Sequence, residues 1–190
     1  MKYVGRKALG YGYPMPTLMV ATYNDDGTVN AMNLHEATRT VEGDMALCIG
    51  EGKKTYANIV KRRAFTIALV NRKLMGAADF FGTVSGCRHP GKFEKTGLKA
   101  VGSGHVDAPI IEGSPLVIEC ELKELVRTDH FSTVIGAIVD VAVDESALDE
   151  AGRPDASRTD MIFYDSFSNS YVSLGEKVGR AWGEGRRFMV

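Results

Sequence analysis

The chain has 190 residues, of which 44% are hydrophobic and 25% are charged, as in an ordinary globular protein with one packed core. Its 23 basic and 24 acidic residues nearly cancel, and no run of Lys or Arg follows one face, which argues against a nucleic-acid partner. No segment approaches the ~20 apolar residues that span a bilayer, and residues 1–7 lack the apolar stretch of a secretory signal, so we expect one cytoplasmic domain over residues 1–190.

The first half of the chain contains short β-prone segments separated by turn signals. Residues 17–23 and 28–32 flank an Asn-Asp-Asp-Gly turn, which predicts a hairpin. Residues 45–50 follow a Glu-Gly-Asp turn, and residues 65–70 show the period-two spacing of a half-buried strand. We expect both of these segments to be strands.

Two short helices are predicted near these strands. Residues 54–62 offer Thr55 as an N-cap and end with cationic residues, which complement the helix dipole. Residues 73–81 form the second helix, although Gly76 lowers the helix propensity there. A glycine-rich segment, residues 82–104, follows without a clear period.

Two longer strands are predicted in the second half. Apolar and charged side chains alternate over residues 116–123, so one face should be core and the other wet. Residues 134–143 are more continuously apolar, and Gly136 indicates a bulge or a close backbone approach. After residue 144 a polar stretch and then aromatic residues indicate a tail packed over the sheet. Strands joined by short turns, with few helices, predict a mainly β antiparallel barrel or sandwich.

The cysteines and histidines give no sign of a metal or a disulfide framework. Cys48, Cys87 and Cys120 are odd in number and include no C-x-x-C pair. A structural zinc site needs about four ligands, and the four histidines are scattered along the chain. We therefore expect buried free thiols and no metal.

One helix start has the character of an anion site. Lys53 and Lys54 precede the helix that should begin at Thr55. Free amides and the positive end of the helix dipole, together with two lysines, suit a phosphate group. The alternative is an ordinary capped surface helix with solvated lysines.

One histidine stands just before the second long strand. His130 follows Thr-Asp and precedes the apolar run of residues 134–143. An imidazole titrates near neutrality, so His130 is a candidate for the rim of a cofactor site. A hydrogen-bonded structural histidine is the alternative.

Nine segments keep a distinctive order and spacing nearly from end to end of the chain. They are residues 14–17, 22–27, 30–32, 54–59, 78–86, 92–98, 107–110, 115–120 and 135–141. Together they resemble the flavin reductase-like family, in particular its flavoredoxin-type members. The resemblance implies an FMN-binding split β-barrel, an antiparallel Greek-key-type barrel with a few short helices.

The resemblance also implies a set of cofactor-binding residues. In similar proteins the stretch after the first hairpin lies along the isoalloxazine ring, and here it consists of Asn30, Ala31, Met32, Asn33 and Leu34. The Thr and Asn of a T-x-x-N helix start hold the phosphate or ribityl chain. Thr55 and Asn58 stand at these two positions, with Lys53 and Lys54 beside them. The Ser-Gly pair and the later Lys of a loop in the family correspond to Ser85, Gly86 and Lys92. The loop would approach the flavin, either within the same chain or from a second subunit.

The chain departs from its relatives beside the expected flavin ring. Relatives often continue after Asn-Ala-Met with Thr and small residues, whereas His35 and Glu36 stand close behind that stretch here. Bulky polar side chains at this place bear on the redox potential, the choice of substrate and the retention of FMN.

The function that the resemblance implies is an FMN-dependent oxidoreductase. The protein would orient the flavin toward NAD(P)H as reductant, with His130 as the catalytic residue on the substrate side. A homodimer and a redox partner protein are also implied. Two alternatives stay open: a non-enzymatic FMN electron carrier, and a split barrel that has lost its flavin.

Overall fold

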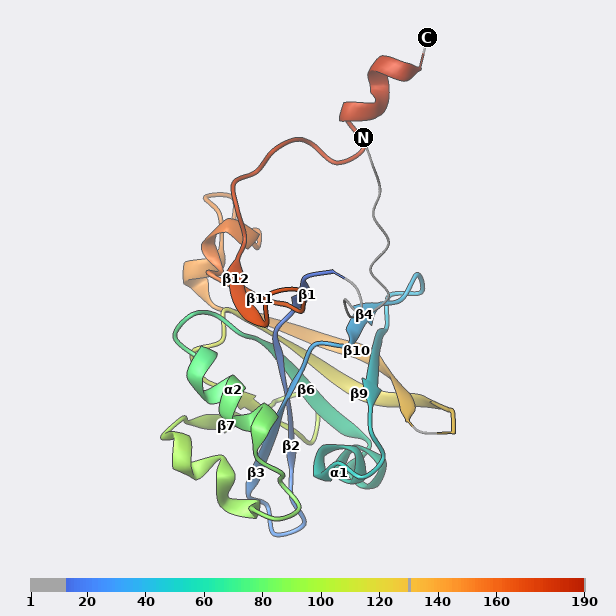
Figure 1. Cartoon of the computed structure of the whole chain (residues 1–190), viewed down its shortest axis with the longest axis vertical. Coiled ribbons are helices and arrows are strands. Elements are labelled where there is room, and N and C mark those ends of the chain that lie inside the picture. Colours follow the sequence, from blue (N-terminus) through green and yellow to red (C-terminus); the bar gives the residue numbers. More distant parts are fainter. Residues whose placement is uncertain (1–12, 130, 190) are drawn as a thin grey trace.

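The computed structural model describes residues 13–129 and 131–189. Its centre is a curled, seven-stranded antiparallel sheet in the order β3-β2-β6-β9-β10-β5-β4 (Figure 1). The strands are β2 Leu18–Tyr23, β3 Val29–Leu34, β4 Ala37–Arg39, β5 Met45–Ile49, β6 Ala64–Leu69, β9 Leu116–Arg127 and β10 Ser132–Val143. The mainly β fold and the first hairpin predicted from the sequence are confirmed.

Smaller elements surround this sheet. The strands β1 Met15–Pro16, β11 Ile162–Asp165 and β12 Ser170–Ser173 form one small sheet, and β7 Ala100–Gly102 pairs with β8 Pro109–Ile111. The helices are α1 Lys54–Arg62 and α2 Met75–Thr83. Short 3-10 turns cover Pro90–Lys92, Glu94–Thr96, Glu145–Ala147, Ala156–Arg158 and Glu184–Phe188. After β12 the chain leads away from the sheets (Figure 1).

Both helices form near their predicted places, with different starts. Helix α1 begins at Lys54, and Thr55 is not its cap: Lys53 is the N-cap residue, without a side-chain hydrogen bond. The Thr55 hydroxyl is instead buried and accepts a hydrogen bond from Asn30. Helix α2 begins two residues later than expected, because Asn71 accepts the Leu74 N–H and holds the preceding residues in a turn.

The central strands are buried on both faces. In β2, Leu18 and Val20 join the core inside the curl, which α1 closes with Tyr56 and Ile59. The alternate residues, among them Met19, join a second core beneath α2. This two-sided burial follows from period-two alternation in a sheet covered by a helix on each side.

The prediction of a wet face on the strand at residues 116–123 was wrong for its first half. Val117 belongs to the second core, and Glu119 is only 2% exposed. The reason is tertiary: β8 packs on the neighbouring strand β6, and Ser103 before it donates a hydrogen bond to the Glu119 carboxylate. A charged residue in an alternating strand pattern is therefore not always exposed to solvent.

The Gly136 prediction is confirmed. The register between β9 and β10 shifts between Ile135 and Gly136, which marks a bulge. A Cβ at Gly136 would overlap the ring of Phe65 on β6, which lies beyond β9 in the sheet. The glycine thus lets an aromatic ring of the core lie directly against the backbone of β10.

The cysteines are free, as expected, but their burial was predicted wrongly. Cys120 is buried, whereas Cys48 and Cys87 are exposed. Cys48 alternates outward from β5, and Cys87 lies in the loop after α2. Within the described part of the chain, no helix has the length and apolarity needed to cross a membrane.

Candidate functional site

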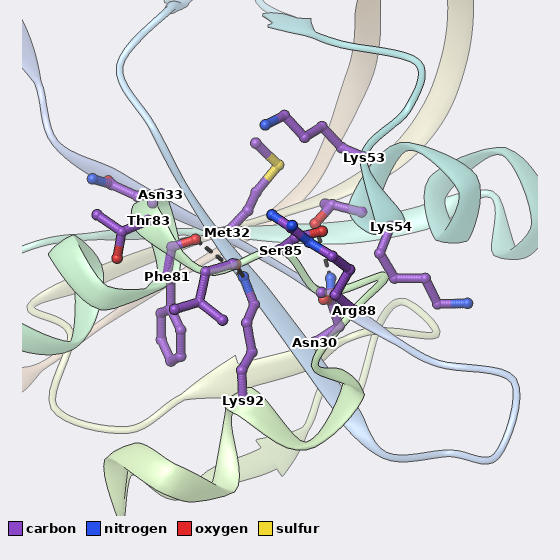
Figure 2. Close-up of a pocket in the computed structure, with 14 residues that line it drawn as sticks. Asn30, Met32, Asn33, Lys53, Lys54, Phe81, Thr83, Ser85, Arg88 and Lys92 are labelled. Atoms are coloured by element: carbon purple, nitrogen blue, oxygen red, sulfur yellow. Dashed lines mark hydrogen bonds between the residues drawn. The ribbon is translucent and has the colours of Figure 1, made fainter.

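A cavity of about 170 Å³ lies where β3, the start of α1 and the loop after α2 meet (Figure 2). Four cationic residues line it, and none of its lining residues is acidic. We call it the cationic cavity. Its lining residues are Asn30, Met32, Asn33, Lys53, Lys54, Thr55, Phe81, Gly82, Thr83, Val84, Ser85, Gly86, Arg88 and Lys92.

Most of the cofactor-binding residues expected from the sequence gather here. Those that line the cationic cavity are Asn30, Met32, Asn33, Lys53, Lys54, Thr55, Ser85, Gly86 and Lys92. The other three lie elsewhere: Ala31 and Leu34 are buried in the two cores, and Asn58 is buried behind the start of α1. The expected catalytic residue, His130, lies outside the described residues.

A buried hydrogen-bond network fixes the start of α1 against the first hairpin. Asn30 Nδ2 donates to Thr55 Oγ1 at 2.8 Å and to Thr22 Oγ1 at 3.3 Å. Asn58 Nδ2 donates to Thr22 Oγ1 and to Asn24 Oδ1, each at 3.0 Å. The T-x-x-N residues Thr55 and Asn58 therefore position the helix. Thr55 accepts in this network, so its own hydroxyl proton remains available toward the cavity.

Lys92 holds the opposite wall of the cavity. Its ammonium is buried, 2% exposed as a residue, and donates to the carbonyls of Phe81 and Val84 at 3.0 and 2.9 Å. These carbonyls belong to the end of α2, where a cation is favoured by the dipole. Burial, reinforced by the charge of Lys53, lowers the pKa of Lys92 to about 8.

The other cations of the cavity differ in direction. Lys53 and Arg88 extend over the same space as Lys92, whereas the Lys54 ammonium is turned away from it (Figure 2). Lys54 lies instead toward the turn of the first hairpin. Hydrogen bonds from Lys61 and Thr28 lower the pKa values of Asp25 and Asp26 there, and the charge of Lys54 adds a smaller effect. Of the two lysines expected to bind phosphate, Lys53 is the better placed.

Gly86 brings the loop after α2 close to the network. A Cβ at this residue would lie 2.6 Å from Asn30 Oδ1 and 3.2 Å from Lys54 Cβ. A larger residue would therefore push the loop away from α1 and widen the cavity. The loop that carries Ser85 and Gly86 thus lies against the start of α1 in its own chain.

A second hollow of about 340 Å³ adjoins the cationic cavity and shares Asn33, Gly82 and Thr83 with it. We call it the aromatic cavity. The His35 ring stacks on Tyr164, with ring centroids 4.6 Å apart. The remaining lining residues are Asp79, Asn169, Ser170 and Tyr171.

The polar groups of the aromatic cavity are held in defined protonation states. Burial lowers the pKa of His35 and so favours its neutral imidazole. Burial and the hydrogen bond to Asp79 raise the pKa of Tyr171 to about 12, so its hydroxyl keeps its proton. Asn33 Oδ1 is buried and has no hydrogen-bond partner among the described residues. Such an orphaned acceptor suits a ligand N–H group.

Sequence reasoning missed two parts of this site. Arg88 lies in the glycine-rich segment, where no periodicity drew attention to it, although a cation three residues after Ser85 in a loop was a usable signal. The aromatic cavity needs Tyr164 and Tyr171, which the sequence placed in a tail. Only the pairing of β11 with β1 brings them beside His35.

Comparisons with known proteins agree with this geometry. Residues 10–168 match the family described as Flavin reductase like domain. The flavoredoxin of Desulfovibrio vulgaris (Miyazaki F) is 33% identical, with 97% of this chain and 99% of that chain covered and a TM-score of 0.87. An FMN-binding protein from Thermus thermophilus is 20% identical over 95% and 99% of the two chains, with a TM-score of 0.75.

A curated relative gives a shorter match. An uncharacterized protein of Aeropyrum pernix is 29% identical over 92 residues, which are 48% of this chain and 35% of that protein. The chain thus matches about a third of the length of that relative. The solved structures, in contrast, are matched over nearly their whole length, and they carry the split-barrel fold expected from the sequence.

Proposed function

The chain belongs to the flavin reductase-like domain family, and from this premise we propose that it is an FMN-binding oxidoreductase that holds the FMN phosphate in the cationic cavity. The observation that carries the proposal is the gathering of Lys53, Arg88 and Lys92 around a hollow without an acidic lining residue. Such a set of charged donors suits a phosphate dianion. The flavoredoxin and the FMN-binding protein named above support the choice of a flavin.

The residues present fit the two ends of an FMN molecule. Cations, the Thr55 hydroxyl and the start of α1 face the cationic cavity, while His35 and Tyr164 offer flat surfaces in the adjoining one. Asn33 lies between the two, with its unpartnered oxygen available to a ring N–H. Bound FMN would supply the electron and hydride transfer chemistry, and the protein orients the cofactor and shields it from water.

The phosphate site is tested by comparing FMN with riboflavin, which lacks the phosphate. We expect Arg88→Ala to weaken FMN binding by about ten- to a hundredfold, since a hydrogen bond to a charged group contributes roughly 1.5–3 kcal/mol. Riboflavin affinity should stay within about twofold, because the lost group is the phosphate partner. Lys54→Ala should have a smaller effect, because its ammonium is turned away. Fluorescence titration of both flavins measures these affinities.

Lys61→Ala is the matched control for this experiment. Lys61 lies in the last turn of α1, is well exposed and pairs with Asp25. Its loss removes a cation from the same helix, but at the end that does not line the cavity. FMN affinity should not change in this variant. If Arg88→Ala weakens both flavins equally, or neither, the phosphate is bound elsewhere.

We further propose that NAD(P)H reduces the bound flavin and that the product electrons pass to a redox partner protein. His35 and Tyr171 stand in the aromatic cavity. A neutral His35 ring can donate a hydrogen bond to a substrate without adding charge, whereas the Tyr171 hydroxyl gives its proton to Asp79 and can accept one from the substrate. His130 stays a prediction for the catalytic residue, and so does the cytoplasmic location.

Reduction is tested by adding NADH or NADPH to the FMN-loaded protein without oxygen. We expect the oxidised flavin absorption to bleach within the turnover time of a flavin reductase, of order seconds. His130→Ala should slow bleaching and leave the flavin spectrum unchanged. A protein that dithionite bleaches but neither nicotinamide reduces would be a non-enzymatic electron carrier. A protein that takes up no added FMN would be a split barrel without flavin.

A further inference from the structure

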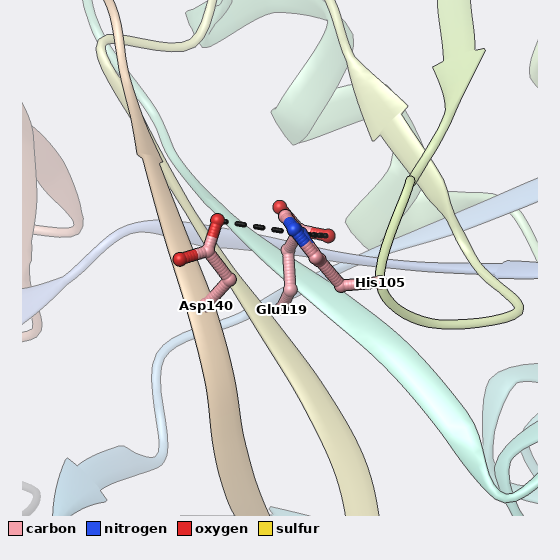
Figure 3. Close-up of side chains that lie close together, drawn as sticks. All are labelled: His105, Glu119 and Asp140. Atoms are coloured by element: carbon pink, nitrogen blue, oxygen red, sulfur yellow. Dashed lines mark ion pairs between the residues drawn. The ribbon is translucent and has the colours of Figure 1, made fainter.

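Three potential metal-binding side chains meet on the far side of the sheet from α1. His105 lies between β7 and β8, Glu119 lies on β9 and Asp140 on β10 (Figure 3). His105 Nδ1 is 3.4 Å from Glu119 Oε2 and 3.3 Å from Asp140 Oδ2. The three ligand atoms all lie within 4.8 Å of one another. None of the three residues lines the cationic or the aromatic cavity.

The sheet register brings the two carboxylates together. Glu119 is paired with Asp140 across β9 and β10, immediately after a register shift between Ile138 and Asp140. A bulge of this kind re-aims the side chains that follow it. It places a carboxylate of β10 directly opposite one of β9.

Two facing carboxylates need a positive charge between them. Like charges directly opposite each other destabilise a sheet, and Glu119 is only 2% exposed, so water screens it poorly. Protonated His105 would be one source of that charge. However, one N–H shared between two oxygens makes two weak bonds, and both separations exceed the ~2.7–2.9 Å of a charge-assisted hydrogen bond.

The two separations from His105 Nδ1 match the edges of a coordination tetrahedron. Zn–N and Zn–O bonds are about 2.0–2.2 Å, which places neighbouring donors of a tetrahedral ion about 3.3–3.6 Å apart. One imidazole nitrogen and two carboxylate oxygens are suitable donors for such an ion. Three protein ligands leave the fourth position to water or a small ligand.

Ser103 supports the arrangement as an outer-shell residue. Its hydroxyl donates to Glu119 Oε2 and accepts the backbone N–H groups of His105 and Val106, both at 2.9 Å. One side chain therefore orients a carboxylate ligand and folds the loop that carries the imidazole. Outer-shell hydrogen bonds of this kind fix the direction of metal ligands.

We propose that His105, Glu119 and Asp140 bind one divalent transition-metal ion, with Zn²⁺ the best match to their spacing. The ion neutralises the facing carboxylates and clips the loop between β7 and β8 to the central sheet. This proposal departs from the expectation of no metal, which considered only ligands close together in the sequence. It does not depend on flavin binding.

The test is a Zn²⁺ titration of metal-free protein whose exposed Cys48 and Cys87 have been alkylated, since thiols also bind zinc. We expect saturation at one ion per chain and a rise in Tm. His105→Ala and Asp140→Asn should weaken binding more than about a hundredfold, and Ser103→Ala about ten- to a hundredfold. His105 and Asp140 are about half exposed, so both variants should fold.

Asp107→Asn is the matched control. Asp107 belongs to the same loop, but its carboxylate pairs with Arg62. The control should bind Zn²⁺ as tightly as the parent protein. The proposal is overturned if the parent shows no saturable binding, if His105→Ala and Asp140→Asn bind as tightly as the parent, or if Ca²⁺ or Mg²⁺ binds more tightly than Zn²⁺.

Discussion

At the residue scale, Lys92 joins structure and binding in one ammonium group. It holds two carbonyls at the end of α2 while facing the cationic cavity, and its pKa is lowered to about 8 by burial. The free protein therefore begins to lose this charge only slightly above neutral pH. Because its pKa in the unfolded chain is near 10.5, the free protein should gain stability as pH rises between about 8 and 10.5.

This titration predicts a pH dependence of FMN affinity. A bound phosphate dianion favours the ammonium and raises the pKa of Lys92, so binding should take up a proton above pH 8. As pH rises above about 8, FMN affinity should fall by up to about tenfold per pH unit, while riboflavin affinity should not change. Lys92→Met should abolish the slope, even if it also lowers stability. Lys95→Met, an exposed neighbour, should keep it.

Binding titrations from pH 7 to 9.5, with proton uptake measured calorimetrically in two buffers, check this prediction. A slope that persists in Lys92→Met would assign the titrating group to another residue. No slope in the parent protein would remove Lys92 from the phosphate site.

At the element scale, the sequence predicted strands and helices where local patterns decide the structure. The first hairpin has its own turn signal, and Gly136 marks a bulge through its missing side chain. Thr55 was misread as a cap because its partner, Asn30, is 25 residues away. The buried Glu119 was expected in water, because nothing local to β9 shows that the loop between β7 and β8 covers it.

The candidate site divides in the same way. Lys53 and Lys54 were found from the start of a helix, which is a local feature. The directions of the two lysine side chains could not be read from the local sequence. Only the folded hairpin shows that Lys54 turns toward Asp25 and Asp26 while Lys53 faces the cavity. The metal-ligand cluster joins residues 105, 119 and 140, and no short spacing rule brings such a set together.

At the scale of the whole molecule, the β9–β10 hairpin suggests where a second copy binds. Val126 and Phe131 near its tip are 47% and 41% exposed, and Val139 and Val141 along β10 are 46% and 41% exposed. Large apolar side chains that gather on one element favour a protein partner. We propose that two chains pair through this hairpin, in keeping with the homodimer implied by the family resemblance.

The dimer is tested by sedimentation of the FMN-loaded protein. We expect a dimer for the parent, and a shift toward monomer in the variant that carries both Val126→Glu and Phe131→Glu, because burying two carboxylates at an apolar interface is costly. Val101→Glu, on β7 and also half exposed, should leave the dimer intact. Lys53, Arg88 and Lys92 line the cationic cavity within one chain, so the monomeric variant should still bind FMN more tightly than riboflavin. A parent protein that sediments as a monomer at all concentrations would contradict the pairing. A monomeric variant that no longer distinguishes the two flavins would show that the partner subunit completes the phosphate site.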